Sequence, residues 1–421
     1  MSSTLAHSDI LIIGGGEAGR CAAEAARVAN PEMTITLVGE EPWLPYNRPP
    51  LSKSALADPA LLPKCQKRDH AFYDSHRIAV LCGRRAERIE PHERVAQLAD
   101  GKLLPWHRLI LATGSRPRHL PLPPATAKRV HYLRTRDDAA RLGSALEAGG
   151  SVGVIGAGFI GLEVAATARR LGCAVTVFER APAVLARVLP ANLASDIETA
   201  HAEQGVTIHK GVDVSVEETT APSFALSATE LASGRQWTER FDTLLIAIGV
   251  VPNVELAAEA GIATQDGIVV DASGRTSAAD VFAAGEVTNH PVAGSDRRAR
   301  YESWQVAQSQ AAAVGSTAAG VVREYAELPW FWSDQYDLNI QKLGHATGEA
   351  TWVFRGDRSG RAFTAFAVAS SGMIEAAVSI NAGRDIAGAR RLMSRRLSVD
   401  LAKLVDPRCS WNTVLASKGT G

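Results

Sequence analysis

Two short apolar runs along the chain each lead into a glycine-rich turn. The first run, Ile10 to Ile13, enters Gly14-Gly15-Gly16-Glu17-Ala18-Gly19. The second run, Val152 to Ile155, enters Gly156-Ala157-Gly158-Phe159-Ile160-Gly161. Helical periodicity follows each turn. An apolar strand, a glycine turn and a helix in this order are typical of a dinucleotide-binding βαβ unit.

Each glycine of such a turn has a physical role. The first allows a tight turn, the second lets the backbone approach a pyrophosphate, and the third lets the helix pack close to the strand. The free N–H groups at the helix N-terminus then attract the phosphates. We expect helices from Ala18 to about Val28 and from Ile160 to about Leu171. The pattern predicts two nucleotide sites, formed by Gly14, Gly16, Glu17, Ala18 and Gly19 and by Gly156, Gly158, Phe159, Ile160 and Gly161.

An acid stands at the tip of the strand that follows each predicted helix. These acids are Glu40 and Glu179, and a carboxylate at this place can accept hydrogen bonds from both hydroxyls of an adenosine ribose. Glu179 favours NADH, because a carboxylate at the ribose repels a 2′-phosphate. Arg180 and Arg187 leave NADPH open, since either can stabilise a phosphate. The alternative is a pair of structural glycine turns with two surface acids.

Further apolar strands end in small residues and divide the chain. Leu109–Gly114 and Leu244–Gly249 end in the same way, and Val281–Glu286 is a third buried strand that returns the chain to its first domain. A helical segment from Tyr301 to about Ala319 follows. The expected fold class is α/β with two Rossmann-like domains and a C-terminal α+β domain. The expected boundaries are 1–115 with 246–325 for the first domain, 116–245 for the second, and 326–421 for the third.

Charge and cysteine content narrow the class further. The chain has 45 basic and 45 acidic residues, so we expect neither nucleic-acid nor membrane binding. The first strand begins by Ile10 without a preceding signal-like segment, which predicts a cytoplasmic protein. The cysteines form no CxxC pair, so we expect no metal and no thiol route for electrons. They are Cys21, Cys65, Cys82, Cys173 and Cys409.

Four segments together resemble the oxygenase-coupled NAD(P)H:ferredoxin reductases. The most specific are Pro45–Lys53 and Trp330–Asp337, and Ala283–Glu286 and Glu302–Gln305 agree with them in order along nearly the whole chain. The resemblance implies a glutathione-reductase-like architecture. It assigns FAD to the first domain and NAD to the second.

The resemblance also assigns roles to Pro45–Lys53. A lysine such as Lys53 lies near flavin N5 in the family and pairs with the glutamate that corresponds to Glu163. A charge there tunes the flavin potential. Arg48 is a rigid charged fork suited to a pyrophosphate, and Pro49 stiffens a loop that can cover the flavin. The alternative is that Lys53 and Glu163 are ordinary surface charges.

Aromatic and acidic residues later in the chain complete the implied site. Trp304 and Trp332 are candidates for contact with the isoalloxazine or the nicotinamide, with core packing as the alternative. Glu302 resembles the family residue near the carboxamide. Glu286 departs from the family aspartate by one methylene. The other implied cofactor contacts are Ala86, Ala112, Thr113, Gly114, Arg134, Ile248, Gly249, Gly285 and Ser303.

The expected activity is hydride transfer from NADH to FAD, followed by single-electron transfer to an acidic [2Fe–2S] ferredoxin that supplies an oxygenase or a cytochrome P450. We expect a monomer or a homodimer. The alternatives are a rubredoxin reductase, an NADH oxidase-like flavoprotein and an NADH-sensing signalling protein. The candidate docking residues are basic clusters, with solvated helix faces as the alternative: Arg297, Arg298 and Arg300, and Arg390, Arg391, Arg395 and Arg396.

Overall fold

The computed structural model describes residues 7–127, 129–217, 223–293, 297–346 and 348–416. The chain forms two compact units. The first unit comprises Met1–Pro45, Asp69–Gly114 and Asn253–Gly421. The second comprises Tyr46–Arg68 and Ser115–Pro252. The segment after Pro45 therefore groups with the second unit. The expected division into three domains stays a prediction.

A seven-stranded sheet forms the base of the first unit, in the order β3-β2-β1-β6-β5-β4 with β17 also paired to β6. Strands β3, β2, β1, β6 and β17 are parallel, whereas β4 and β5 add an antiparallel extension. Their bounds are β1 Ser8–Ile13, β2 Ile35–Val38, β3 Ile78–Leu81, β4 Ala86–Glu90, β5 Val95–Leu98, β6 Leu103–Leu111 and β17 Val281–Ala283.

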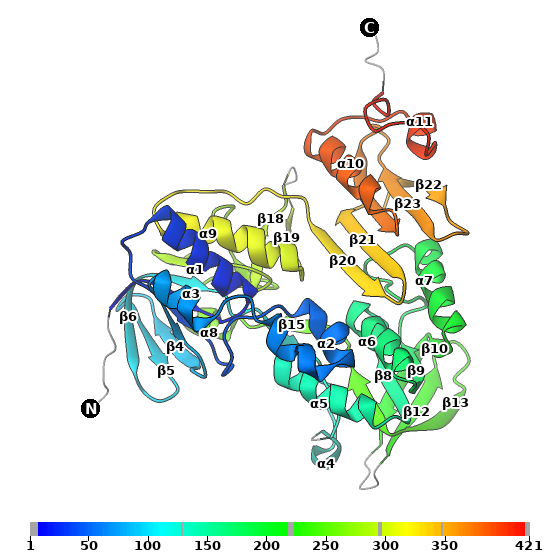
Figure 1. Ribbon diagram of the computed structural model, residues 1–421, viewed down its shortest axis with the longest axis horizontal. Helices are drawn as coiled ribbons and strands as arrows, with labels where there is room; N and C mark the ends of the chain where they lie inside the picture. The colour runs from blue at the N-terminus through cyan, green and yellow to red at the C-terminus, as the bar shows by residue number, and fades with distance from the viewer. Residues whose placement is uncertain (1–6, 128, 218–222, 294–296, 347, 417–421) are drawn as a thin grey trace. The chain divides into compact units, whose positions relative to one another are not determined.

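Both faces of this sheet are covered, which explains its continuous apolar runs. Ile10 and Ile12 pack beneath helices α1 (Glu17–Ala29) and α9 (Ala311–Ala318), which lie side by side in Figure 1. Leu11 and Leu109 face the opposite cluster. The smaller elements of this part are α3 His70–Ser75, α8 Glu255–Glu259, β16 Ile268–Val269, β18 Thr288–Pro291 and β19 Arg298–Ala299.

The C-terminal part of the first unit is a five-stranded antiparallel sheet in the order β20-β21-β24-β23-β22. Helix α10 (Gly383–Ser394) packs on it through Ile386, Ala389 and Leu392 (Figure 1). The other bounds are β20 Trp330–Gln335, β21 Leu338–Gly344, β22 Thr351–Asp357, β23 Ala362–Val368, β24 Ile374–Ile380 and α11 Leu401–Val405.

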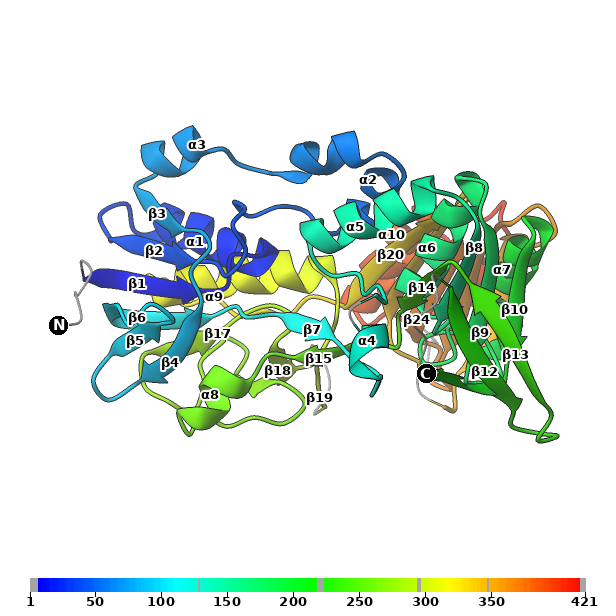
Figure 2. The same cartoon turned by 90° about the horizontal axis from the view of Figure 1, so that it is seen from below.

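The second unit repeats the strand–loop–helix pattern of the first. Its parallel sheet has the order β10-β9-β8-β14, and an antiparallel sheet, β11-β12-β13, lies beside it (Figure 2). The bounds are β7 Ser115–Pro117, β8 Ser151–Ile155, β9 Ala174–Glu179, β10 Val206–Lys210, β11 Val212–Val216, β12 Phe224–Glu230, β13 Gln236–Phe241, β14 Thr243–Ile246 and β15 Val250–Pro252.

Helices of the second unit pack around this sheet and around the segment that follows Pro45. That segment forms two 3₁₀ helices and one short α-helix: η1 Pro49–Ser52, α2 Ser54–Ala57 and η2 Pro59–Cys65. The remaining helices are α4 Pro124–Ala127, α5 Arg136–Glu147, α6 Phe159–Arg170 and α7 Ala191–Glu203. Leu51, Ala55 and Leu62 pack against Ala139 of α5, so the segment has its own apolar anchor.

The helical predictions are confirmed for α1 and α6, whose ends differ from the expected ones by a residue. The helix expected from Tyr301 is wrong at its start. Tyr301–Ser303 is not helical, and Val306–Gln310 forms a π-helix, η3, before α9 begins. Such π segments are rare and occur often at functional sites. Among the described residues, no helix has the length and apolar character to cross a membrane.

Candidate functional site

The first glycine loop is shaped by close backbone contacts. Gly14 has φ of +126°, and a Cβ built on it would lie 2.0 Å from the carbonyl oxygen of Ala112. A Cβ on Gly19 would lie 1.9 Å from the carbonyl oxygen of Gly14. Gly16 caps α1, and a Cβ there would meet no described atom within 4 Å. The outer glycines are therefore required by packing, while Gly16 presents open backbone to a phosphate.

The second loop repeats this arrangement. Gly156 has φ of +105°, and a Cβ on it would lie 2.5 Å from the carbonyl oxygen of Ala247. A Cβ on Gly161 would lie 2.0 Å from the carbonyl oxygen of Gly156. Gly158 caps α6 and, within the described part of the chain, has open space at its Cβ position. Both loops thus fit a pyrophosphate at a helix N-terminus.

Several predicted contacts of the first unit meet at the carboxyl end of its sheet. Ala112, Thr113 and Gly114 follow β6, which pairs with both β1 and β17. Gly285 follows β17 closely, with φ of +83°, and a Cβ on it would lie 2.7 Å from Cβ of Ala18. The turn that carries Glu286 is therefore adjacent to the first glycine loop.

Two side chains outside the predicted set, those of Gln308 and Gln310, help to hold these turns. The Gly285 amide donates to Oε1 of Gln310 at 2.8 Å, and Gln308 Nε2 donates to Glu17 Oε1 at 2.6 Å. Thr113 Oγ1 donates to the carbonyl of Asn253 at 2.7 Å. Gln308 and Gln310 both lie on the π-helix, whose extra residue no pattern in the sequence reveals. The sequence analysis missed them for that reason.

The two acids at the strand tips are held differently. Glu40 is exposed and lies 3.4 Å from Arg85. Glu179 accepts from the Ala157 amide at 2.7 Å and from the Ala181 amide at 2.8 Å. The Glu179 carboxylate is thereby fixed against the second glycine loop.

Arg180 and Arg187, the two arginines that follow Glu179 in sequence, have different neighbours. Arg180 is exposed and lies 3.5 Å from Asp213. The Arg187 guanidinium lies beside Gly249, where a Cβ would be 3.3 Å from Nη2. Ile248 and Gly249 follow β14, whose neighbour β8 enters the second loop. Of the two arginines, Arg187 therefore lies beside the turn at Gly249, which is next to the second glycine loop.

Lys53 and Glu163 form a nearly buried ion pair in the second unit. Lys53 Nζ lies 2.8 Å from Glu163 Oε2, and the two side chains are 16% and 4% exposed. Ser52 Oγ donates to the same carboxylate oxygen, and Thr167 Oγ1 donates to the Ser52 carbonyl at 2.9 Å. Lys53 also donates to the Pro49 carbonyl at 3.2 Å. The alternative that Lys53 and Glu163 are ordinary surface charges is therefore wrong, because both side chains are largely buried.

Arg48 is fixed by its own neighbours. Nη1 donates to Tyr46 Oη at 3.3 Å and to the carbonyl of Arg134, and the guanidinium lies 5.3 Å from the Tyr46 ring. Tyr46 Oη in turn accepts from the Arg136 amide at 2.8 Å. These contacts set the direction of the Arg48 side chain before any ligand binds.

Three tryptophans of the first unit form one cluster. Trp304 meets Trp332 edge to face with centroids 5.6 Å apart, and Trp332 stacks on Trp330 at 5.3 Å. Arg390 lies 5.8 Å from the Trp330 ring. The tryptophans are half-buried, so they are not core aromatics of the ordinary kind. The loop before them holds Glu302, which pairs with Arg300 at 2.9 Å.

The first basic cluster differs from the docking surface expected of it. Arg300 is 9% exposed and also pairs with Asp266 at 3.0 Å, so the docking expectation is wrong for this residue. Arg298 donates to the carbonyls of Val270 and Asn289. Arg297 is exposed, although it precedes these bound residues directly.

The remaining predicted residues lie in ordinary structural positions. Ala86 is buried in β4, Ser303 accepts from the Val306 amide at 3.2 Å, and Phe159 and Ile160 begin α6. Ile160 is 45% exposed. None of these positions by itself specifies a ligand.

Three of the five thiols lack the features of a redox nucleophile. No disulfide joins the five cysteines, all of which lie in the described ranges. Burial raises the pKa of the Cys65, Cys82 and Cys173 thiols. Because the thiolate is the reactive form, these three residues are poor nucleophiles at neutral pH.

The fold and the paired loops define a class of nucleotide-dependent oxidoreductase, and comparison with known families agrees. A family model described as pyridine nucleotide-disulphide oxidoreductase matches residues 8–311, and one described as reductase C-terminal matches residues 330–415. The chain belongs to the pyridine nucleotide-disulphide oxidoreductase family.

Among individual relatives, the chain is 42% identical to the anthranilate 1,2-dioxygenase system ferredoxin–NAD(+) reductase component of Burkholderia cepacia, over 96% of this chain and 98% of that protein. Solved structures agree. The ferredoxin reductase for the CYP199A2 system of Rhodopseudomonas palustris matches with a TM-score of 0.89 and 34% identity, over 97% of this chain and all of that one. Putidaredoxin reductase in its covalent complex with putidaredoxin matches with a TM-score of 0.90 and 32% identity, over 97% and 98%.

Proposed function

We propose that the protein is an FAD-dependent NADH:ferredoxin reductase of an oxygenase or cytochrome P450 system. The observation that carries the proposal is the pair of glycine cradles, one in each unit, in a chain whose five cysteines, all within the described ranges, form no disulfide. The relatives named above, which are ferredoxin reductases, support the same activity.

The residues present fit the two nucleotides. Gly14 and Gly16 with the N-terminus of α1 suit the pyrophosphate of FAD, and Glu40 suits its adenosine ribose. Glu286 adds an acceptor beside Gly285. Bound FAD supplies the chemistry that converts a two-electron hydride donor into a one-electron donor.

We propose that Lys53 and Arg48 also serve the flavin. Arg48 is preset by Tyr46 and so loses little rotamer freedom when it binds a phosphate. The Lys53 ammonium lies 2.8 Å from the Glu163 carboxylate and donates to the Pro49 carbonyl. A fixed cation beside a flavin raises its affinity for electrons.

NADH is the proposed donor. Glu179 is held against the second loop by the amides of Ala157 and Ala181. In this position its charge opposes a 2′-phosphate. Trp304 and Trp332, with Glu302 nearby in sequence, are the proposed contacts of the nicotinamide and the isoalloxazine.

The electron acceptor is proposed to be an acidic [2Fe–2S] ferredoxin. The support is a group of exposed arginines on α10 and directly after it: Arg391, Arg395 and Arg396. Arg390, on the same helix, lies over the Trp330 ring. Opposite charges accelerate encounter and make it sensitive to salt. Charge reversal of Arg395 and Arg396 should slow ferredoxin reduction several-fold at low salt, while ferricyanide reduction by NADH stays unchanged. Unchanged ferredoxin rates would remove this surface from the proposal.

The decisive experiment is anaerobic reduction of the purified flavoprotein. NADH should bleach the flavin, and added [2Fe–2S] ferredoxin should then be reduced in steady state. A rubredoxin serves as the matched alternative acceptor. Flavin reduction without transfer to either iron–sulfur protein would contradict the reductase proposal, and a long-lived NADH-reduced complex in air would favour the sensor alternative.

A further inference from the structure

Two histidines and one aspartate converge where the amino end of strand β1 lies beside the middle of strand β6. The residues are His7, Asp9 and His107, and one ligand atom of each lies within 4.8 Å of the other two. They are far from the glycine loop. Gly14 follows the six-residue strand β1, which spans about 20 Å at about 3.3 Å per residue.

Strand register produces this convergence. Ser8 pairs with Trp106 and Ile10 with Arg108 in the parallel β1–β6 ladder, which places Asp9 opposite His107. Side chains alternate between the faces of a strand, so His7 lies on the same face as Asp9. The arrangement therefore follows from backbone pairing and does not depend on a chance meeting of long side chains.

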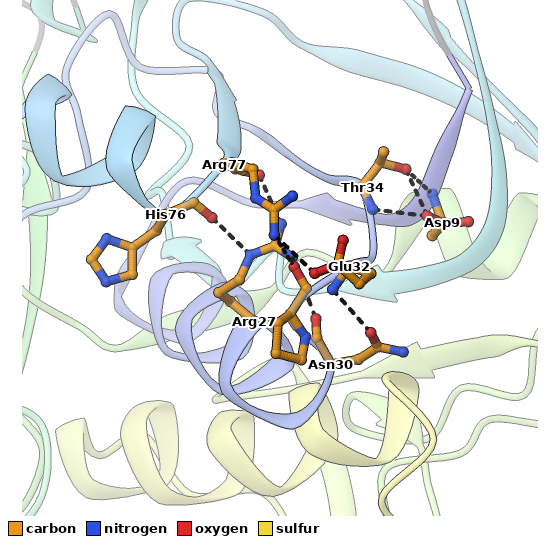
Figure 3. Close-up of polar contacts among 8 residues, drawn as sticks. Asp9, Arg27, Asn30, Glu32, Thr34, His76 and Arg77 are labelled. Atoms are coloured by element: carbon orange, nitrogen blue, oxygen red, sulfur yellow. Dashed lines mark hydrogen bonds and ion pairs between the residues drawn. The ribbon is translucent and has the colours of Figure 1, made fainter.

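Asp9 is oriented by Thr34, the residue directly before strand β2. Its Oδ2 accepts from the Thr34 amide at 2.8 Å and from Thr34 Oγ1 at 2.9 Å (Figure 3). Its Oδ1 lies 3.2 Å from Nδ1 of His107. The hydrogen bond from the Thr34 amide, as the main cause, holds the pKa of Asp9 below its usual value. One carboxylate oxygen is thus anchored and the other is directed toward the imidazoles.

The two imidazoles lie face to edge on one side of this carboxylate. The His7 and His107 rings have centroids 4.1 Å apart and planes inclined by 60°. His107 is 59% exposed and Asp9 is 34% exposed, so a ligand can enter from solvent. The alternative to a ligand site is a simple His107–Asp9 ion pair with the His7 ring packed beside it.

We propose that His7, Asp9 and His107 form a binding site for a divalent transition metal such as Zn²⁺ or Cu²⁺. Imidazole nitrogen suits these ions, whereas Mg²⁺ and Ca²⁺ require oxygen ligands. Three protein ligands leave a position for water. The Thr34 contacts match the outer hydrogen bonds that orient metal-binding carboxylates.

The site differs from what the sequence led us to expect. No metal was anticipated, because the cysteines are scattered and His107 stands a hundred residues after His7. Binding there joins the start of β1 to β6, so the metal stabilises the folded unit by mass action and takes no part in electron transfer.

The test uses the full-length flavoprotein without a histidine tag. Titration calorimetry with ZnCl₂ should show one ion per chain, and MgCl₂ should give no binding heat. His7→Ala and His107→Ala should each weaken zinc binding about tenfold or more, and Thr34→Val by a smaller factor within the roughly 10–100-fold range known for outer-sphere partners. His92→Ala, which removes another exposed histidine, is the matched control and should leave binding unchanged.

Copper supplies a readout that folding defects do not mimic. Electron paramagnetic resonance of the Cu²⁺ form should show two imidazole nitrogens, and one after either histidine is removed. Flavin content and NADH–ferricyanide activity should be unchanged in all variants. Equal zinc affinity in the His7→Ala/His107→Ala double variant, absence of zinc binding up to millimolar concentration, or zinc-induced dimers that require His7 would overturn the intrachain site.

Discussion

The two glycine loops are nearly the same in backbone geometry, but the acids near the start of the helices that follow them are neutralised differently. In the first, Glu17 pairs with Arg20 at 2.7 Å, one turn along the same helix. In the second, Glu163 on α6 pairs with Lys53, which lies more than a hundred residues earlier. The backbone cradle is therefore local and repeated, whereas the charge partner of the second loop is supplied by tertiary structure.

This difference separates a backbone feature that occurs twice from a charge pair that is particular to the second unit. The glycine positions serve any pyrophosphate, and so the same local pattern occurs twice. The Glu163–Lys53 pair is specific to one place and brings a charged segment, Pro49–Lys53, to a defined position on α6. Four experiments test this division, in order of decreasing expected effect.

The largest effect is expected for Gly14→Ala. A Cβ at Gly14 would overlap the Ala112 carbonyl oxygen at 2.0 Å, and φ of +126° is strained for alanine. Together these terms should cost about 4 kcal/mol or more. Thermal unfolding should show a large loss of stability together with loss of FAD. Gly16→Ala is the matched control and should fold normally, because its Cβ position is open.

The equivalent change in the second loop sharpens the comparison. Gly156→Ala meets the Ala247 oxygen at 2.5 Å and should also destabilise, though less. If both Gly14→Ala and Gly156→Ala were as stable as the unaltered protein, the close contacts would not be the reason for glycine at these positions.

The second effect concerns the two acids. Glu163→Gln leaves Lys53 without its carboxylate in a site where only 16% of the lysine side chain is exposed, and should cost about 3 kcal/mol. Glu17→Gln should cost about 1 kcal/mol, because Arg20 retains Glu24 at 2.7 Å. Urea unfolding measures both.

A double variant separates pairing from local packing. Lys53→Met combined with Glu163→Gln should destabilise less than the sum of the single changes, because no buried charge is then left alone. Additive losses, or equal losses for Glu17→Gln and Glu163→Gln, would contradict the distinction between a local and a tertiary charge partner.

Much of this architecture was predictable because it depends on local sequence patterns. The apolar runs, glycine spacing and strand-tip acids placed β1, α1, β8 and α6 nearly to the residue. The resemblance of Pro45–Lys53 to a family signature led to Glu163. These features depend on short stretches of chain, where periodicity and turn chemistry are strong signals.

What escaped prediction depends on tertiary pairing. The π-helix that carries Gln308 and Gln310 leaves no periodic pattern in the sequence. Its contribution is seen only in the hydrogen bond that Gln310 accepts from the Gly285 amide. Arg300 seemed available for docking, yet Asp266 lies 34 positions away and neutralises it. Such contacts are fixed by loop packing, which composition and spacing do not encode.

The third effect compares the acids at the strand tips. Glu179→Gln removes the charge that opposes a 2′-phosphate, so the NADH preference in kcat/KM should fall about tenfold, equivalent to about 1.4 kcal/mol. Glu40→Gln makes the same change beside the first loop and should leave the NADH-to-NADPH ratio unaltered. An unchanged ratio in Glu179→Gln would show that Arg180 or Arg187 decides the preference.

The smallest expected effect concerns alkylation of the thiols. Cys65 is the cysteine closest in sequence to Lys53, and burial both shields it and raises its pKa. Because alkylation requires an accessible thiolate, iodoacetamide at neutral pH should leave NADH-to-ferredoxin turnover nearly unchanged. Mass spectrometry of the treated protein identifies which cysteines reacted, and flavin absorbance shows whether FAD is retained. A Cys65→Ser variant should behave like the unaltered protein in turnover. Loss of turnover on alkylation with FAD still bound would place a thiol in the electron path, and the two loops would then serve a disulfide mechanism.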